Sequence, residues 1–582
     1  MQHAYSPSFY HTTPKWHEPL PATFSLQHAK LRAWLVLGVF AVGYILLASY
    51  LGVMPLQHDD EDYASNATHK LKEYVPWRAN IVDRNGVILA TNLQTTSIYA
   101  KPKAIRDKTE TVAALIKIFP ELSAEKLLQE LHSDKKFIWI KRNVTPKALY
   151  EVNNLGIPGI EYEQSQQRVY PQGNLVSHAI GYASIDNRGL SGIEQFFNTA
   201  LTQHIQQKTA PEPIQLSLDV RIQTIIREEL ARGIEQYAAT GGTGIVLDAT
   251  NGEVVAIVNL PDFDPSNPTA TPNEHRFNRA TLGLYEVGSI LKTFTVAMGL
   301  DSGTTDINDQ VDVTHPIKVS RFSIKDFQPR VGLQNIANLF LNSSNIGMVR
   351  MAQNMGAELQ QRYLQSFGFF DEVSIELPER ATPQHPPLKK WDELSLMTIS
   401  YGYGIALTPM HVAQAMGAIV NGGTLMPASL VKSDTDTPRT VRTVISPQTS
   451  TRMQQLLRLN ALHGTARKSA VPGYVVGSKT GTAHKLAGTG GYASNLRISS
   501  LIGAFPMHAP RYVILVMLDS PKPSKETLGF ATGGWTAAPV ASRMITRIAP
   551  VLSIAPVNES APEIQEITGE LGKMLESAHG AI

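Results

Sequence analysis

The sequence predicts an α+β protein with a single N-terminal membrane-spanning helix, and three observations lead to this fold class. An uncharged apolar segment covers residues 33–54. Short apolar runs separated by turn residues, as expected for strands, occur at 243–261 and again at 473–519. Segments with helical spacing of apolar residues lie between these two groups. A sheet whose first strands precede a helical block and whose last strands follow it is typical of an α+β domain.

Length and composition limit the possible functions. A chain of 582 residues exceeds one ordinary domain, so we expect two or more. The net charge of +2 gives no general attraction to nucleic acid, and no local basic face stands out. The chain contains no cysteine, which excludes disulfides, thiolate metal sites and cysteine nucleophiles. The histidines show no metal-binding spacing, so we expect neither a metal nor another cofactor.

The apolar segment 33–54 is long enough to cross a bilayer as a helix at 1.5 Å per residue. Lys15, Lys30 and Arg32 precede it, whereas an acidic run at 59–62 follows. This asymmetry predicts that residues 1–32 form a cytoplasmic tail and that the remainder lies outside the inner membrane. A cleaved signal peptide and a buried core helix are the alternatives. The long leader and the lack of a convincing small-x-small cleavage site favour an uncleaved anchor.

We expect residues 55–213 to form a first, elongated domain of mixed structure. The stretch "WRANIVDRNGVILATN" predicts strand, turn and strand, with Asn85-Gly86 supplying the positive φ angles of a tight hairpin. Two short amphipathic helices are expected between 108 and 134, separated near Pro120. Ser123 is expected to cap the second helix. The proline-bearing stretch "KTAPEPIQLS" predicts a linker to the next domain.

Residues 214–555 predict a second, larger domain. It begins with the helical pattern "IQTIIREELARGIEQY" and continues with two apolar strands around another turn, Asn251-Gly252. Two further helical stretches are expected at 333–356 and 409–423, before the late strands. The tail from 556 to 582 predicts a short helix of unknown use.

Four serines lie three residues before a lysine, which is the spacing of a nucleophile and its base on one helical face. These pairs are Ser289/Lys292, Ser123/Lys126, Ser133/Lys136 and Ser429/Lys432. Ser289 follows a glycine and precedes a plausible helix, "SILKTFTVAMGL". A lysine desolvated near another cation has a lowered pKa and can accept the serine proton. A helix-capping serine beside a solvated lysine is the alternative for every pair.

Two further motifs single out the pair at Ser289. Ser343-x-Asn345 is the only Ser-x-Asn in the chain, and Lys479-Thr480-Gly481 is the only Lys-Thr-Gly. Both follow Ser289, in the order known for β-lactamases and penicillin-binding proteins, where the identity of the acylation base is debated. Each triplet alone is a weak signal. All three in this order are a strong one.

With these motifs, the chain resembles the class B penicillin-binding proteins, and within them the division-type (FtsI-type) peptidoglycan D,D-transpeptidases. The resemblance extends to "RANIVDRNG", "RVYPQGNLVSHAIGY", "GLSGIE", "VLDATNGEVVAIVNLPDFDPSNP", "SYGYGIALTPMHVAQA" and "FATGGWTAAP". Gly189, Gly192 and Glu194 favour the division type over the elongation type. The resemblance implies that 55–213 is a non-catalytic pedestal of the dimerisation type. It also implies that 214–555 is a transpeptidase domain with a β-lactamase-like fold, a sheet flanked by helices.

The resemblance also implies a role for each motif residue. Ser289 would attack the carbonyl between two D-alanines of a stem peptide, and Lys292 would accept its proton. Ser343 and Asn345 would pass a proton to the leaving D-alanine and hold the substrate amide, and Lys479 would supply positive charge. The implied substrate-binding residues are Thr480, Gly481 and Thr482, and the N–H groups of Ser289 and Thr482 would form the oxyanion hole. β-Lactams would acylate the same serine and leave slowly.

The implied partners are peptidoglycan stem peptides, the membrane, a glycan polymerase of the FtsW type and other division proteins. Val287 stands where the family usually has proline before Gly-Ser, which alters the entry to the helix without removing a reacting group. An elongation-type enzyme of the lateral wall and a division scaffold with little catalysis remain alternatives. A β-lactamase would need neither an anchor nor a pedestal, and a bifunctional enzyme would need a glycosyltransferase domain that the sequence does not show.

Overall fold

The computed structural model describes the following residues: 22–57, 77–207, 209, 211–319, 322–433, 440–486, 491–569 and 571–572. Helix α1 (Ala22–Gln57) contains the predicted segment 33–54, and its stretch Lys30–Ser49 has a mean hydropathy of 2.0 with side chains exposed along its length. By length and composition this helix can cross a membrane once. Lys15 and the acidic run at 59–62 lie outside the described residues. The described residues from 77 onward form a separate compact unit.

The pedestal, here residues 77–215, is built on a mixed sheet. Its strands run in the order β3-β2-β1-β5, and β4 pairs antiparallel with β2 on the side away from β3. The bounds are β1 Ile81–Val82, β2 Ile88–Ala100, β3 Ile138–Val144, β4 Ile160–Val169 and β5 Ile214–Gln215. Strand β2 is 13 residues long. Its N-terminal end pairs with β1 and its C-terminal half pairs with β3, so the strand contributes to two hydrophobic cores.

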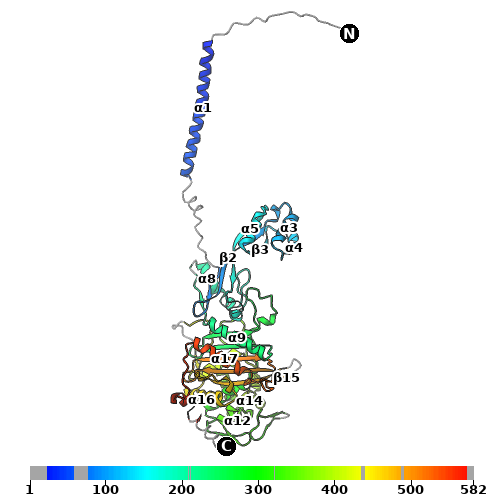
Figure 1. Ribbon diagram of the computed structural model, residues 1–582, viewed down its shortest axis with the longest axis vertical. Helices are drawn as coiled ribbons and strands as arrows, with labels where there is room; N and C mark the ends of the chain where they lie inside the picture. The colour runs from blue at the N-terminus through cyan, green and yellow to red at the C-terminus, as the bar shows by residue number, and fades with distance from the viewer. Residues whose placement is uncertain are drawn as a thin grey trace, which may run out of the picture. The chain divides into compact units, whose positions relative to one another are not determined.

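Three helices pack against β3 and the C-terminal half of β2 (Figure 1): α3 (Lys108–Ile118), α4 (Ala124–Leu131) and α5 (Pro146–Asn154). The predicted pair of helices separated near Pro120 is confirmed by α3 and α4. Ser123 caps α4 as expected, since its hydroxyl accepts a hydrogen bond from the Lys126 N–H at 3.3 Å. These helices bury Leu115 and Leu131 against the strands.

A buried ion cluster in the pedestal links the segment before β1 to β4 and to the short helix α7. Glu194 in α7 (Gly192–Phe196) accepts from Arg78 at 2.8 Å and from Arg168 on β4 at 2.6 Å. All three side chains are almost fully enclosed. Burial is the main cause of the lowered pKa of Arg78, and the Glu194 carboxylate opposes it. One carboxylate shared by two arginines therefore compensates the buried charge.

The predicted hairpin turns form, but with a different backbone conformation. Gly86 and Gly252 have φ angles of 85° and 77°, whereas neither asparagine before them has a positive φ. Side-chain hydrogen bonds explain the difference. The Asp83 carboxylate accepts from the N–H of Asn85, and the Asn251 side chain accepts from the N–H of Glu253. Such side-chain turns stabilise a bend in which only the glycine adopts the left-handed conformation.

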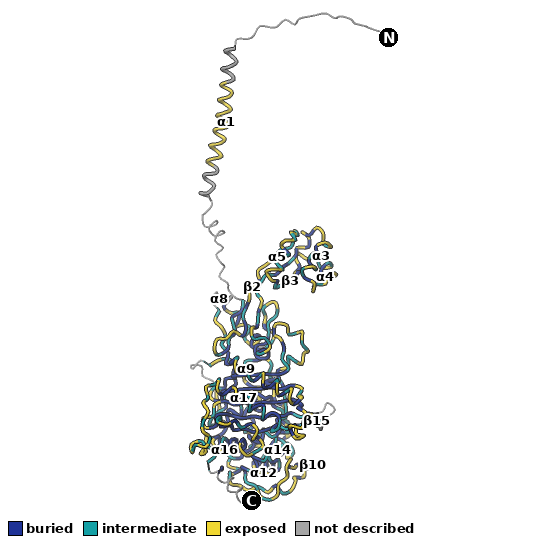
Figure 2. Tube along the Cα trace, viewed as in Figure 1, coloured by how far each residue is buried: buried dark blue, intermediate teal, exposed yellow. Residues whose placement is uncertain are grey.

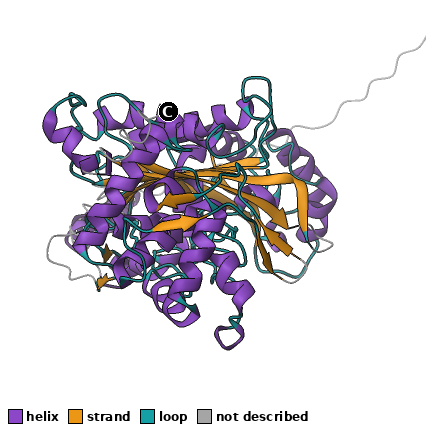
Figure 3. Ribbon diagram, turned by 90° about the horizontal axis from the view of Figure 1, so that it is seen from below, coloured by secondary structure: helices purple, strands orange, loops and turns teal. Residues whose placement is uncertain are grey.

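The C-terminal domain is built on a five-stranded antiparallel sheet with the order β14-β15-β16-β6-β7. The strands are β6 Gly241–Asp248, β7 Val254–Leu260, β14 Gly477–Leu486, β15 Tyr492–Phe505 and β16 Tyr512–Asp519. The late strands therefore extend a sheet that the early hairpin begins, as the sequence predicts. Helices lie on both faces of this sheet (Figure 3). The strand order places β14 at its edge.

Two helices, α9 (Val220–Gln236) and α17 (Ala537–Val551), pack together on one face of the sheet. The other face is covered by α15 (Pro409–Val420), with α10 (Leu291–Ser302) and α16 (Pro447–His463) in the same apolar core. Figure 2 shows that the sheet, with α17 against it, is among the most deeply buried parts of the unit. The edge strand β14 therefore lies between β15 and the helical region that carries the other motifs.

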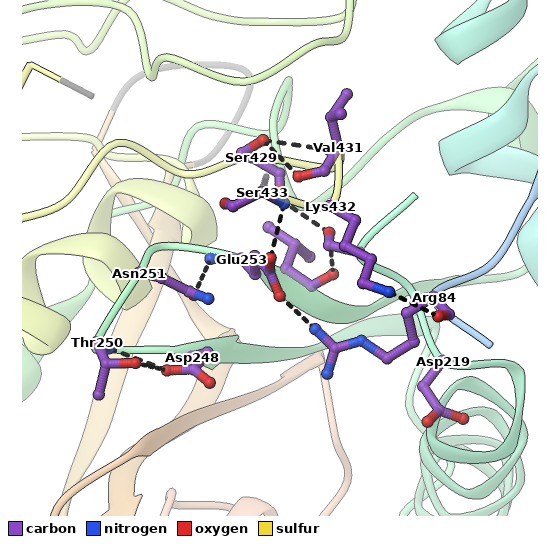
Figure 4. A network of polar contacts seen from close by, with 12 residues as sticks. Arg84, Asp219, Asp248, Thr250, Asn251, Glu253, Ser429, Val431, Lys432 and Ser433 are labelled. Atoms are coloured by element: carbon purple, nitrogen blue, oxygen red, sulfur yellow. Dashed lines mark hydrogen bonds and ion pairs between the residues drawn. The ribbon is translucent and has the colours of Figure 1, made fainter. Parts of the chain in front are cut away.

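A polar network joins the pedestal to the C-terminal domain (Figure 4). Arg84 of the first pedestal turn forms an ion pair with Glu253 of the β6–β7 turn, and Glu253 also accepts from the Ser433 N–H at 2.8 Å. Lys432 donates to the backbone oxygen of Arg84 at 3.3 Å. A backbone hydrogen bond from the Lys432 N–H to the Gln215 oxygen, at 3.1 Å, continues the contact. The two turns predicted from sequence are thus parts of one junction.

The segment after α17 packs against the C-terminal domain. Glu559 forms an ion pair with Arg458 at 2.6 Å and accepts from the Gly473 N–H at 2.8 Å. A one-turn helix, α18 (Pro562–Gln565), follows, as the sequence predicts, and Leu571 is buried. Residues 573–582 lie outside the described part of the chain.

Candidate active site

Ser289 lies at the entry to a helix, held close to the edge strand β14. A 3₁₀ turn, Gly288–Ile290, leads into α10, so the helix predicted to begin at Ser289 starts as a tighter turn. Gly288 has a φ of 53°, and a side chain at this position would lie 2.3 Å from the Thr482 backbone oxygen. Only glycine fits such an approach. Val287 has a φ of −90° and is buried, so it enters the turn without proline.

Ser343 and Asn345 stand at the start of α12 (Asn345–Met355), opposite Lys292 of α10. The Lys292 amino group donates to the Ser343 backbone oxygen, lies 3.1 Å from Ser343 Oγ and lies 2.7 Å from Asn345 Oδ1. Ser343 has a φ of 57°, which is unusual for a residue other than glycine. This conformation directs both its backbone oxygen and its hydroxyl to the same amine. No hydrogen bond joins Ser289 Oγ to Lys292 Nζ within the described residues.

Asp326 fixes this arrangement, although it belongs to none of the motifs found in the sequence. Its carboxylate accepts from the Ser344 hydroxyl at 2.7 Å and from the N–H groups of Asn345 and Ile346 at 2.5 and 3.0 Å. These N–H groups belong to the first turn of α12 and would otherwise lack partners. Because Asp326 lies 18 residues before Ser344, neither a capping pattern nor a short motif could have identified it.

Lys479 and Thr480 lie on the edge strand β14, on the other side of Ser343. Lys479 Nζ is 3.1 Å from Ser343 Oγ, and the Thr480 hydroxyl donates to Thr465 Oγ1 at 3.0 Å. The structure therefore brings the third motif to the first two, as predicted. A side chain at Gly481 would lie 2.6 Å from the Val287 backbone oxygen, so this position also requires close approach of two backbones.

Two lysines thus share one serine hydroxyl in an enclosed site. Lys292 and Lys479 are both 0% exposed. Burial first, and then the charge of Lys479, lower the pKa of Lys292 well below its usual range, while the Asp326 carboxylate opposes this. Burial lowers the pKa of Lys479 to about 7. The lowered pKa of Lys292 favours its neutral form, and the pKa of Lys479 places its proton exchange near neutral pH.

The hydrogen bonds around Ser343 are compatible with a neutral Lys292. A neutral amine has two donors and one lone pair. It can donate to the Ser343 backbone oxygen and to Asn345 Oδ1, and accept from the Ser343 hydroxyl. Lys479 can then donate to Ser343 Oγ. The result is a continuous chain of hydrogen bonds, Lys479 to Ser343 to Lys292, along which a proton can pass.

The other three Ser-x-x-Lys pairs have structural contacts. Ser123 caps α4, and the Ser133 hydroxyl donates to the Glu130 backbone oxygen at 2.6 Å. Ser429 donates to the Glu376 carboxylate at 2.8 Å within the junction to the pedestal. Only Ser289 adjoins the other two motifs.

Comparison with known proteins agrees with this geometry. The model of the penicillin-binding protein transpeptidase domain matches residues 242–546, and that of the penicillin-binding protein dimerisation domain matches 73–208. The chain is 32% identical over 569 residues to a probable peptidoglycan D,D-transpeptidase FtsI from Caulobacter vibrioides, covering 93% of this chain and 94% of the relative. It is 27% identical to the peptidoglycan D,D-transpeptidase FtsI of Escherichia coli K12, covering 82% and 84%.

Solved structures share the fold. Penicillin-binding protein 3 from Mycobacterium tuberculosis, in complex with aztreonam, matches with a TM-score of 0.65 at 22% identity, covering 83% of this chain and 98% of that one. A peptidoglycan synthetase from Bifidobacterium adolescentis matches with a TM-score of 0.66, also at 22% identity, covering 84% and 98%. This chain contains, in order, an apolar N-terminal helix, a dimerisation domain and a transpeptidase domain with three converging motifs. It therefore belongs to the class B penicillin-binding proteins.

Proposed function

We propose that the protein is a serine D,D-transpeptidase that cross-links peptidoglycan stem peptides at the division septum. The observation that carries this proposal is the convergence of the three motifs, with Lys292 and Lys479 both in contact with the Ser343 hydroxyl. The names of the relatives from Caulobacter and Escherichia supply the reaction class and the division type. Gly189, Gly192 and Glu194 support the same type.

In acylation, Ser289 Oγ attacks the carbonyl carbon between the two terminal D-alanines while its proton passes to Lys292 Nζ. The carbonyl oxygen becomes negative, and the N–H groups of Ser289 and Thr482 stabilise it. The C–N bond then breaks. A proton reaches the leaving nitrogen through Ser343, and D-alanine departs. Asn345 holds the substrate amide, while Thr480 and Gly481 provide contacts for the terminal carboxylate along β14.

In the second half-reaction, a neutral amine of another stem peptide attacks the ester carbon. The C–O bond to Ser289 breaks, an amide bond forms, and the proton from the amine returns to Ser289 Oγ. β-Lactams acylate the same serine, but the ring fragment stays attached and the adduct is long-lived. Every group in both half-reactions comes from the chain or the substrates, so no cofactor is required.

The topology and the partners follow from the anchor and the pedestal. The positive residues before the apolar segment 33–54 favour a cytoplasmic N-terminus and a periplasmic catalytic domain. We assign 1–32 to the cytoplasmic tail, 33–54 to the anchor, 55–213 to the pedestal, 214–555 to the transpeptidase domain and 556–582 to the tail. The anchor and the pedestal would contact a membrane-embedded glycan polymerase of the FtsW type and other division proteins.

Labelling with a fluorescent penicillin tests the reaction. The wild-type chain should form a long-lived covalent adduct that Ser289→Ala lacks, whereas Ser429→Ala, at the alternative Ser-x-x-Lys pair, should be labelled like wild type. Absence of an adduct would refute the transpeptidase, and rapid drug turnover would instead indicate a β-lactamase.

Depletion in cells tests the division type. Undivided filaments are expected, whereas round cells would show the elongation type.

A further inference from the structure

A cation and an aromatic cluster lie next to the third motif, and no step described above uses them. Lys468 Nζ is 4.3 Å from the centroid of the Trp535 ring. Phe530 stacks on Trp535 with centroids 5.9 Å apart and ring planes 18° apart. Phe327, one residue after Asp326, meets the edge of Phe530 at 6.4 Å. We call Lys468 and Trp535 the rim pair.

Close backbone contacts place the rim pair beside Thr480. The Gly533 N–H donates to Thr482 Oγ1 at 3.1 Å. A side chain at Gly534 would lie 2.6 Å from the Thr465 backbone oxygen and 3.9 Å from Thr480 Cγ2. Trp535 is the next residue after Gly534, and Lys468 follows Thr465 by three residues. The rim pair is therefore adjacent to the side of the cleft where Thr480 holds the terminal carboxylate of the donor.

The charge of Lys468 is available to a ligand. Lys468 and its neighbour Arg467 are exposed, and within the described residues neither forms an ion pair with an acidic side chain. An ammonium group on an indole face keeps its charge while part of its water is removed. Its position is also fixed more firmly than that of a free surface lysine, which lowers the cost of ordering it when an anion binds.

We propose that the rim pair binds a carboxylate of the stem peptide that supplies the amine, and this inference rests on the proposed function. Aminolysis of the acyl-enzyme is the chemical reverse of acylation with a different amine. The incoming amine must therefore approach from the side on which D-alanine leaves, which is the side of Thr480. A peptide whose amine reaches Ser289 from there extends past Thr465 toward Lys468. Stem peptides carry carboxylates, which an ammonium on an aromatic wall is suited to bind.

Lys468 takes no part in the bond changes, so it is a positioning residue. Its loss should raise the acceptor concentration needed for half-maximal cross-linking and leave the maximal rate nearly unchanged. The same carboxylate chemistry is present on the leaving D-alanine. If the rim pair recognised that group instead, acylation by a donor peptide would slow.

The test uses the full-length chain in detergent with a thioester donor. One acceptor peptide carries an amine and a distal carboxylate, and a second has this carboxylate converted to an amide. For Lys468→Gln we expect roughly a fivefold higher half-saturating concentration of the first acceptor, as for one partly exposed charge pair, and no change for the second. Trp535→Leu should act in the same direction. Lys389→Gln, at another exposed lysine, is the matched control.

The outcomes separate the two proposals. Acylation of wild type by the donor, with formation of cross-linked product, supports the proposed function. Three results for Lys468→Gln would overturn the role of the rim pair and leave the proposed transpeptidase activity intact. They are an equal effect on both acceptors, an effect on acylation alone, and no effect. A wild-type chain that is not acylated would overturn both. Penicillin labelling of each variant confirms that it is folded.

Discussion

Two regions of this molecule each bury two cations around a single central side chain, with opposite consequences. In the pedestal, Arg78 and Arg168 surround the carboxylate of Glu194. In the catalytic cleft, Lys292 and Lys479 surround the hydroxyl of Ser343. All four cations are nearly or completely enclosed, so burial alone does not distinguish the two regions.

The group at the centre decides what the cations do. A carboxylate supplies a full negative charge, and two arginines cannot lose their protons in the accessible pH range, so the pedestal cluster is static. A hydroxyl supplies no charge, and lysine loses its proton when it is desolvated beside another cation. The same degree of burial thus gives a structural clamp in one region and a proton-transfer chain in the other.

The largest expected effect comes from Lys292→Gln. It removes the amine that accepts the Ser289 proton, so acylation by a fluorescent penicillin should slow by about 10²- to 10⁴-fold, the contribution of a general base. The fold should survive because a neutral amide replaces a lysine whose buried charge is unfavourable. Stopped-flow labelling and thermal unfolding measure the two effects. An acylation rate within tenfold of wild type would exclude Lys292 as the base.

Glu194→Gln should show the converse, a loss of stability with little loss of chemistry. It leaves two buried arginines without a negative partner, and breaking such a buried group costs about 3–5 kcal/mol. Urea denaturation of the full-length chain in detergent measures it, and the folded fraction should still bind penicillin.

Glu161→Gln is the control for this prediction. Its ion pair with Lys101 is 2.6 Å long, but both partners are nearly half exposed. Such a pair contributes less than about 1 kcal/mol. Equal losses for Glu194→Gln and Glu161→Gln would show that the pedestal cluster is not a structural clamp.

The sequence predicted the elements of both regions, but only part of their contacts. Ser289, Ser343 and Lys479 were identified because their order along the chain is itself a signal. The structure places Lys479 against Ser343 and holds Gly288, the neighbour of Ser289, against β14. The α+β fold and several helices, such as α9 and α15, followed from apolar spacing, which depends on local burial, whereas α16 and α17 were not predicted. The turn at Asn85 was assigned the wrong backbone conformation, because the side chain of Asp83 outweighs the preference of Asn-Gly.

Contacts between residues far apart in the sequence could not be predicted in this way. Asp326 holds the start of α12 from an irregular segment, and its partners share no pattern with it. The pairing of Lys468 with Trp535 spans 67 residues and depends on how two loops cross beside β14. The same holds for the Arg84–Glu253 junction. Each of these contacts can be recognised only once the tertiary fold is known.

The smallest expected effect comes from Lys479→Arg. This substitution places an arginine in the catalytic cleft, as in the pedestal cluster. In wild type, Lys292 must be neutral, so acylation should rise with pH as the lowered pKa of Lys292 is passed. Lys479 must be charged, and its pKa is about 7, so its contribution is present at lower pH and is lost as the pH rises through that value. The two limbs give a bell-shaped profile that belongs to the coupled pair.

An arginine at 479 keeps its charge, so the alkaline fall should disappear while the acid limb remains, at a lower maximal rate because the guanidinium is larger and planar. Rates of penicillin acylation from about pH 5 to about pH 10 reveal this. An alkaline fall at the same pH in both proteins would assign that limb to another group. It would also mean that the charge of Lys479 is not needed at Ser343. Lys292 alone would then distinguish the cleft, where a proton is transferred, from the static pedestal cluster.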